Sequence, residues 1–113
     1  VEEFETTDEL YLMELHGDLD VLLEADYDGK AEGFVEEDWP QETWPVFYSK
    51  KVDKGQVLYL TLGHCRGHYD MHDLPEPLEY YPAVERCAWD LPVFYTLLRR
   101  GINWAKEEVF VSK

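Results

Sequence analysis

The sequence predicts one small α/β domain, and three stretches of the 113-residue chain carry this prediction. Residues 56–62 are apolar at nearly every position, which is typical of a strand buried on both faces in the middle of a layered α/β sheet. A second strand-like run, residues 44–51, precedes it across a turn sequence, which indicates an antiparallel hairpin. Residues 92–105 repeat apolar side chains at helical spacing, which indicates a C-terminal helix.

The N-terminal part of the chain predicts a short helix, a strand and a loop. Thr6 and Glu9 have the spacing of a capping box, so we expect a short helix to start here and to end at Gly17. Residues 20–25 are an apolar run bounded by turn-forming residues, and we interpret them as a strand. Residues 26–41 are acidic and contain Gly and Pro, so we expect a surface loop.

The hairpin and the last helix have their own boundary signals. Pro45 cannot donate to a strand ladder and should therefore mark the start of its strand. In the turn, Gly55 is expected to supply a positive φ. Asp90 is the expected N-cap of the last helix, with Pro92 near its first position. The apolar stripe expected to face the core comprises Phe94, Leu97, Leu98, Ile102 and Ala105.

Composition limits the classes of partner. The net charge of −15 argues against nucleic acid and anionic membrane surfaces, because both are bound by an excess of Lys and Arg. No apolar run approaches the roughly 20 residues that a membrane span needs. Two cysteines, Cys65 and Cys87, do not require a disulfide in a chain with this much core material, so we expect reduced thiols and a cytoplasmic protein. We expect a small-molecule ligand and no cofactor.

The candidate site lies around His64, which follows the apolar strand directly. In open α/β sheets, ligands bind beyond the carboxyl ends of the strands. Imidazole and carboxylate groups suit hydrogen bonding to sugar hydroxyls and also general acid/base chemistry. The residues that would converge there are His64, Asp8 and Glu9 as catalytic groups, with Tyr11, Arg66, Tyr69 and Asp70 as substrate-binding groups. A purely structural role, with Asp8 and Glu9 capping a helix, explains the same residues equally well.

Two further interpretations of this segment remain open. His64, His68 and His72 are spaced by four and would share one face of a helix, as in a metal-dependent hydrolase, although nearby Gly and Pro residues interrupt a helix here. Residues 63–67 read G-x-C-x-G after a strand, the sequence form of a nucleophile elbow with Cys65 as nucleophile. An elbow requires a helix immediately afterwards, and the following residues favour a loop.

Taken together, several segments resemble the trehalose-utilisation (ThuA-like) family. The matching segments, in the order and spacing of that family, are residues 8–11 (DELY), 20–23, 45–48, 55–64 (GxVxYxxLGH) and 97–105 (LLxxGIxWA). The resemblance extends from about Thr6 to Ala105. It differs at Cys65, where the family usually has Asp.

The resemblance implies a fold and a class of substrate. ThuA-like proteins are similar to class I glutamine amidotransferases, with a flavodoxin-like, three-layer α/β sandwich, and they are linked to the metabolism of sugars, including 3-keto-disaccharides. Asp8, Glu9, Tyr11 and His64 fall on family motif positions near the site. The family domain is roughly twice as long, so the chain corresponds to its C-terminal half. We therefore expect the missing N-terminal half, or self-association, to complete the domain, and no glutaminase activity is implied. The long 65–90 segment would then serve as a lid.

Overall fold

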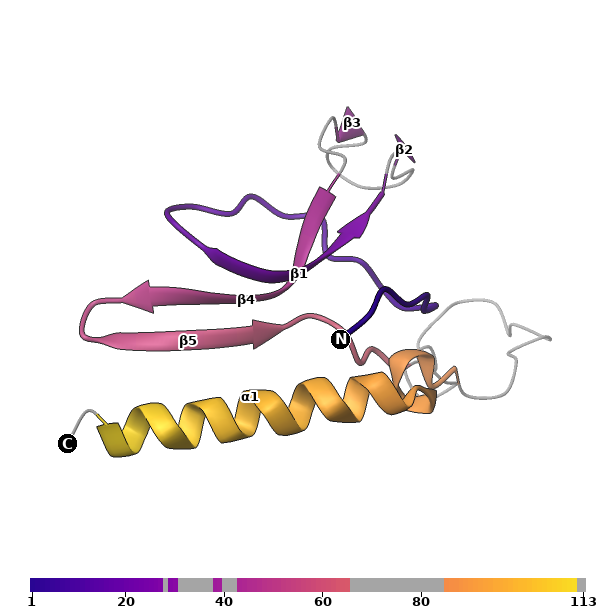
Figure 1. Cartoon of the computed structure of the whole chain (residues 1–113). Helices are drawn as coiled ribbons and strands as arrows, with labels where there is room; N and C mark the ends of the chain where they lie inside the picture. Colours follow the sequence, from indigo (N-terminus) through magenta and orange to yellow (C-terminus); the bar gives the residue numbers. More distant parts are fainter. Residues whose placement is uncertain (28, 31–37, 40–42, 66–84, 112–113) are drawn as a thin grey trace, which may run out of the picture. The chain divides into compact units, whose positions relative to one another are not determined.

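The computed structural model describes residues 1–27, 29, 30, 38, 39, 43–65 and 85–111. Within them, the chain forms a three-stranded antiparallel sheet, a short two-stranded ladder and one C-terminal helix, so the fold is mixed α/β as predicted (Figure 1). The chain divides into two compact units. Leu10–Thr61 is the sheet unit, and Val1–Glu9 together with Leu62–Lys113 is the helix unit. No helix in the described ranges is both long and apolar enough to cross a membrane.

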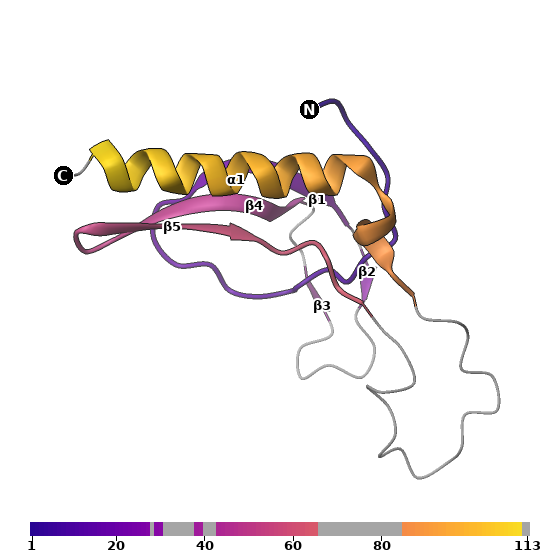
Figure 2. The same ribbon diagram turned by 90° about the horizontal axis from the view of Figure 1, so that it is seen from below.

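The sheet unit contains the predicted strand and the predicted hairpin. Its strands are β1 (Asp20–Asp26), β4 (Thr43–Val52) and β5 (Gly55–Leu60), in the order β1-β4-β5. Both neighbouring pairs are antiparallel, and the β4–β5 hairpin is visible in both views (Figures 1 and 2). The interpretation of residues 20–25 as a strand and of the next two runs as an antiparallel hairpin is therefore confirmed.

Strand β4, not β5, is buried on both faces. Trp44, Val46 and Phe47 of β4 are 1%, 3% and 7% exposed, and their side chains alternate between the two faces. In β5, by contrast, Val57 and Tyr59 are 49% and 42% exposed. The prediction that residues 56–62 form a strand buried on both faces is wrong, because β5 lies at the edge of this sheet and β4 occupies its centre.

Two details of β4 differ from expectation. Pro45 is the third residue of the strand rather than its start, and it lies opposite Glu24 beside a register irregularity between Leu23 and Glu24. Such an irregularity accommodates a residue without an N–H group. In the β4–β5 turn the positive φ belongs to Asp53, at 53°, rather than to Gly55. Asp tolerates this left-handed conformation better than most side chains.

The segment expected to be a loop contains a small ladder. β2 (Gly29–Lys30) and β3 (Asp38–Trp39) pair in an antiparallel manner. The expectation of a loop over residues 26–41 is therefore wrong at these four paired positions and at Asp26, the last residue of β1. A two-residue pairing adds little stability by itself, because isolated two-stranded structures are marginal in water.

The helix unit ends in a 3₁₀ helix followed by an α-helix. The 3₁₀ helix η2 covers Cys87–Asp90, and α1 covers Pro92–Val111, so Pro92 takes the first helical position as predicted. Asp90 is not the expected N-cap, because it is the last residue of η2 and Leu91 directly precedes α1. Its carboxylate instead accepts a hydrogen bond from Arg86 Nε at 2.8 Å.

The apolar stripe predicted on α1 is buried only in its first half. Phe94 and Leu97 are 2% and 5% exposed, whereas Ile102 is 61% exposed and Ala105 is also exposed. The apolar repeat correctly predicted a helix, but the spacing of apolar residues does not show how much of the helix is packed against other residues.

Candidate functional site

The carboxylate of Asp8 joins three segments of the helix unit. Its Oδ1 accepts hydrogen bonds from the backbone N–H groups of Glu9 (2.8 Å) and His64 (3.2 Å). Its Oδ2 accepts from the backbone N–H groups of Gly63 (3.0 Å) and Ala88 (3.2 Å). Hydrogen bonds to an ionised acceptor are stronger than those between neutral groups. Asp8 therefore fixes the backbone beside His64 and ties it to the 3₁₀ helix.

This arrangement corrects the prediction of a helix starting at Thr6. Residues 1–19 contain no helix or strand, and the Thr6 hydroxyl donates to the backbone oxygen of Thr7. A capping box satisfies the first N–H groups of a helix from nearby side chains. Here the Asp8 carboxylate instead accepts hydrogen bonds from backbone N–H groups distant in the sequence, and the capping box of Thr6 and Glu9 is not formed.

Gly63 has the backbone that this junction requires. Its φ is 105°, in the region that favours glycine, and a Cβ atom there would lie 2.7 Å from Cζ of Phe94. Its carbonyl oxygen accepts a hydrogen bond from Trp89 Nε1 at 2.7 Å. The Trp89 and Phe94 rings pack edge to face, with centroids 4.8 Å apart. The chain entering His64 is thus held by both hydrogen bonding and packing.

His64 and Glu9 form the chemically distinctive pair of the site. Nε2 of His64 lies 2.5 Å from Oε2 of Glu9, and the two side chains are 29% and 36% exposed. A carboxylate at this distance orients the imidazole and favours a proton on Nε2. In the neutral ring, Nδ1 is then the nitrogen that can accept a proton. The three predicted catalytic residues, His64, Asp8 and Glu9, are therefore brought together.

Cys87 lies beside this group but is not a ready nucleophile. Burial, followed by the negative charge of Asp8, raises the pKa of the Cys87 thiol. A raised pKa keeps the sulfur in the thiol form, whereas nucleophilic attack requires the thiolate. Cys65, the candidate of the elbow interpretation, is partly buried, and neither cysteine is in a disulfide.

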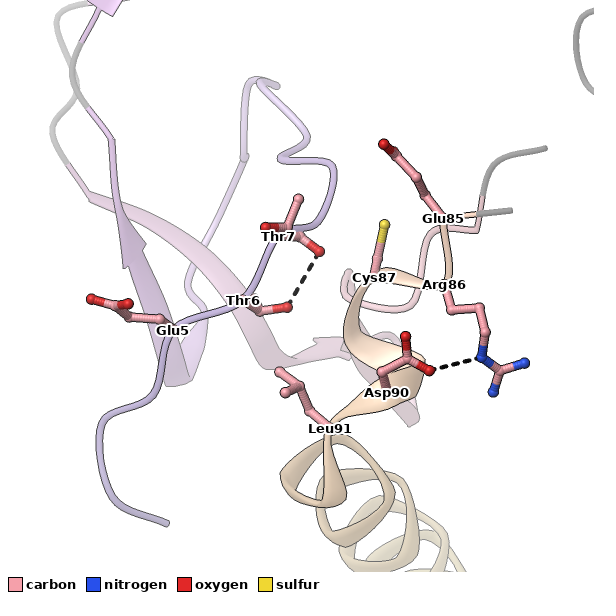
Figure 3. Close-up of a pocket in the computed structure, with 8 residues that line it drawn as sticks. All are labelled: Glu5, Thr6, Thr7, Glu85, Arg86, Cys87, Asp90 and Leu91. Carbon is pink, nitrogen blue, oxygen red and sulfur yellow. Dashed lines mark hydrogen bonds and ion pairs between the residues drawn. The ribbon is translucent and has the colours of Figure 1, made fainter. Parts of the chain in front are cut away.

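A cavity of about 380 Å³ opens in the same unit. Figure 3 shows its wall formed by residues 5–7 on one side and by the segment around η2 on the other. The first of these segments continues directly into Asp8, and the second contains Ala88. The cavity thus adjoins the Asp8 junction along the chain.

The other predicted site residues remain predictions. Tyr11 belongs to the sheet unit and is 38% exposed. The remaining predicted ligand-binding and metal-binding residues, Arg66, His68, Tyr69, Asp70 and His72, lie outside the described residues. Among the side chains that the structure describes, no three His, Cys, Asp or Glu residues are grouped closely enough to hold a metal ion.

Sequence reasoning missed the parts of the site that the backbone supplies. The N–H group of Ala88 and the indole of Trp89 were not expected to contribute. Their contribution depends on a contact across more than twenty residues of chain, which no spacing pattern encodes. The one available signal was Gly63, because a glycine immediately before a candidate catalytic residue often marks an unusual backbone.

Comparison with protein-family models found no match, and comparisons with curated proteins and with solved structures found none either. The resemblance to ThuA-like proteins therefore depends on the sequence motifs alone.

Proposed function

We propose that this chain is the C-terminal portion of a ThuA-like domain that acts on, or binds, a sugar-derived small molecule. His64 is the general acid/base or polar anchor of this site, and Glu9 orients its ring. The observation that carries the proposal is the 2.5 Å approach of Nε2 of His64 to Oε2 of Glu9. The complete domain is a flavodoxin-like sandwich that includes an N-terminal half.

The chemistry follows from the orientation of the imidazole. With the proton of Nε2 directed to Glu9, Nδ1 accepts a proton from a sugar hydroxyl, or from the carbon next to a keto group, and later returns it. Asp8 is a positioning residue in this scheme, since its carboxylate binds the backbone of His64 rather than the ligand. Neither the proton transfer by His64 nor the positioning by Asp8 and Glu9 requires a charged substrate.

The charge of the chain favours a neutral substrate. At a net charge of −15, the protein repels phosphorylated sugars and other anions at long range. A 3-keto-disaccharide, the substrate class that the family resemblance suggests, carries no charge. The proposal therefore concerns neutral saccharides and their oxidised forms.

The test compares two histidine substitutions in the native polypeptide that carries this chain. His64→Gln is the test variant, and His16→Gln is the matched control, because His16 also faces a glutamate, Glu14, at 3.5 Å but is 80% exposed. Conversion of a 3-keto-disaccharide and binding of the parent disaccharide are followed by NMR. We expect His64→Gln to slow conversion by about 10²-fold or more, the usual contribution of a general acid/base, while His16→Gln changes nothing. Unchanged conversion and binding in His64→Gln would contradict the proposal.

A second candidate is a non-catalytic sugar-binding or assembly module. The exposed apolar side chains Val57 and Tyr59 on the edge strand β5 favour it, because exposed apolar side chains and an unpaired strand edge are both features that association covers. Saturable binding of the disaccharide without any conversion, together with a concentration-dependent mass in solution, would favour this candidate over the enzyme.

A further inference from the structure

The two cysteines of the 113-residue chain adjoin the Asp8 junction, in which one carboxylate joins separate segments of the helix unit. His64, whose backbone N–H group donates to Oδ1 of Asp8 at 3.2 Å, immediately precedes Cys65. Ala88, whose N–H group donates to Oδ2 at 3.2 Å, immediately follows Cys87. The carboxylate therefore holds the neighbours of both cysteines together.

Further contacts give the two segments an antiparallel order. The indole N–H of Trp89 donates to the carbonyl oxygen of Gly63 at 2.7 Å. The N–H group of Gly63 donates at 3.0 Å to the same carboxylate oxygen as that of Ala88. The contacts thus proceed forwards from residue 63 and backwards from residue 89. The next positions in this order are Cys65 and Cys87, so we expect these two residues to lie opposite each other, as across an antiparallel pair.

The thiols are close enough to interact, and an oxidant can reach them. Burial is the main cause of the raised pKa of the Cys87 thiol, and a negative charge on Cys65 adds to it. Neither residue is fully buried, and Cys87 lines the cavity of about 380 Å³. Figure 3 shows the sulfur of Cys87 projecting outward from the start of η2. Small oxidants therefore have access to this side chain.

The backbone of Cys87 is also unusual. Its φ is 50°, and among the described residues other than glycine a positive φ occurs at Cys87 and at Asp53. Asp adopts this left-handed conformation several times more often than most side chains, whereas Cys has no such preference. Unfavourable conformations of this kind concentrate at functional sites, because the surrounding structure must compensate for their cost.

We propose that Cys65 and Cys87 form a reversible disulfide, a redox-controlled cross-link beside His64. The oxidant is a peroxide: one thiolate attacks it, the O–O bond breaks, and a sulfenic acid and hydroxide form, the hydroxide taking up the thiol proton. The sulfur of the second cysteine then attacks the sulfenic sulfur, the S–S bond forms, and water leaves. Two electrons pass from the two sulfurs to the peroxide, and a dithiol reductant reverses the reaction. This inference does not rest on the proposed function.

The raised pKa of Cys87 affects the rate of this reaction more than its end point. Because the thiolate is the reacting form, a raised pKa slows formation of the disulfide. A stabilised thiolate is what makes a disulfide easy to reduce, and Cys87 lacks that stabilisation. We therefore expect a disulfide that forms slowly and persists until a reductant acts on it.

The test measures the equilibrium between dithiol and disulfide in glutathione buffers, using the native polypeptide that carries this chain. Trypsin cleaves after Arg66 and Arg86, so the disulfide links peptides 55–66 and 87–99, which mass spectrometry identifies. The equilibrium gives the effective concentration of the two thiols, in the folded protein and again in concentrated urea. We expect it to be about 10-fold or more higher in the folded protein, because folding holds the two segments together. An effective concentration that is the same in urea, or higher there, would overturn the inference.

The matched controls are Cys65→Ser and Cys87→Ser. Each should form only a mixed disulfide with glutathione, and oxidation should raise the urea midpoint of the parent but of neither variant. Circular dichroism checks that all three proteins are folded before oxidation. Mixed glutathione disulfides in the folded parent, without the linked peptides, would contradict the proposal.

The position of the cross-link beside His64 has its own readout. The imidazole NMR resonances of His64 should differ between the dithiol and disulfide forms, because Cys65 is its neighbour and Asp8 holds its backbone. Those of His16, in the sheet unit and 80% exposed, should not change. Unchanged His64 resonances in the oxidised protein would show that the disulfide does not affect the candidate site, contrary to the proposal.

Discussion

At the residue scale, Asp8 illustrates how much a local motif can mislead. The sequence placed Asp8, Glu9 and His64 in one candidate site, and in the structure the Asp8 carboxylate accepts hydrogen bonds from the backbone N–H groups of the other two residues. It did not indicate which hydrogen bonds join them, because Thr6 and Glu9 have the spacing of a capping box and predicted a local helix start instead. The Asp8 carboxylate accepts hydrogen bonds from the backbone N–H groups of residues 63, 64 and 88. Contacts between residues so far apart in the chain cannot be predicted from the spacing of residue types.

Replacing Asp8 should therefore destabilise the helix unit. Asp8→Ala removes an acceptor shared by four backbone N–H groups and should lower the free energy of unfolding by about 2–3 kcal/mol, the scale of lost hydrogen bonds to a charged group. Urea denaturation measures the difference. Asp18→Ala, at an exposed position of the sheet unit, is the control and should be nearly neutral. Equal effects of the two substitutions would show that the Asp8 junction is not stabilising.

The thiol of Cys87 gives a pH-dependent prediction at the same scale. Burial and the neighbouring Asp8 carboxylate raise its pKa, so less thiolate is present at any given pH than for an unperturbed cysteine. In a Cys65→Ser variant, the rate of Cys87 alkylation should consequently rise with pH at a higher midpoint than the rate for a cysteine in an unstructured peptide. Asp8→Asn should move the midpoint back towards lower pH, because it removes a negative charge. A midpoint at or below that of the peptide would contradict the raised pKa of the Cys87 thiol.

At the element scale, the sequence predicted which segments form strands and helices better than it predicted their burial. Residues 20–25, the hairpin and the start of α1 at Pro92 were found as expected. The prediction that β5 is buried on both faces was wrong, because strand order decides which apolar run lies in the centre of the sheet. Strand order depends on pairing between segments distant in the sequence.

Gly63 should be the least replaceable glycine among those described at positive φ. Gly63→Ala combines a left-handed backbone with a Cβ atom only 2.7 Å from Cζ of Phe94, and should cost about 2–4 kcal/mol. Gly17→Ala is the matched control: its φ is also positive, at 80°, but its Cβ would meet the flexible Lys50 side chain at 3.7 Å, so about 1 kcal/mol is expected. Urea denaturation compares them. A Phe94→Leu background should reduce the cost at Gly63, and no reduction would contradict the predicted clash.

Helix α1 should be sensitive to truncation only in its first half. Leu97→Ala removes a side chain that is 5% exposed and should cost about 2–4 kcal/mol, as for buried leucines in general. Ile102→Ala removes one that is 61% exposed and should change stability by less than about 0.5 kcal/mol. A large effect at Ile102, measured by urea denaturation at low protein concentration, would indicate that the second half of the helix is also packed.

At the scale of the whole molecule, the fold could be predicted only as a class. The α/β character and the antiparallel hairpin follow from local periodicity and turn chemistry. The flavodoxin-like sandwich depends on the family resemblance, which implies more polypeptide than these 113 residues. Val57 and Tyr59 of the edge strand β5 share one face of the sheet and are about half exposed.

This proposal predicts the size of the native protein. If the chain is the C-terminal half of a ThuA-like domain, the intact mass of the protein isolated from its source should be near twice 13.4 kDa or more. A native mass of 13.4 kDa would favour the binding or assembly module, with the edge of β5 covered by self-association.

The measurement we would make first is the rate of 3-keto-disaccharide conversion by His64→Gln, Glu9→Gln and the double variant. Residues that act as one catalytic unit show strongly non-additive losses. Because Nε2 of His64 contacts Oε2 of Glu9 at 2.5 Å, we predict that the double variant is no slower than His64→Gln alone. Losses that multiply in the double variant, or a conversion rate that none of the substitutions changes, would contradict the His64–Glu9 pair as the acid/base group of this protein.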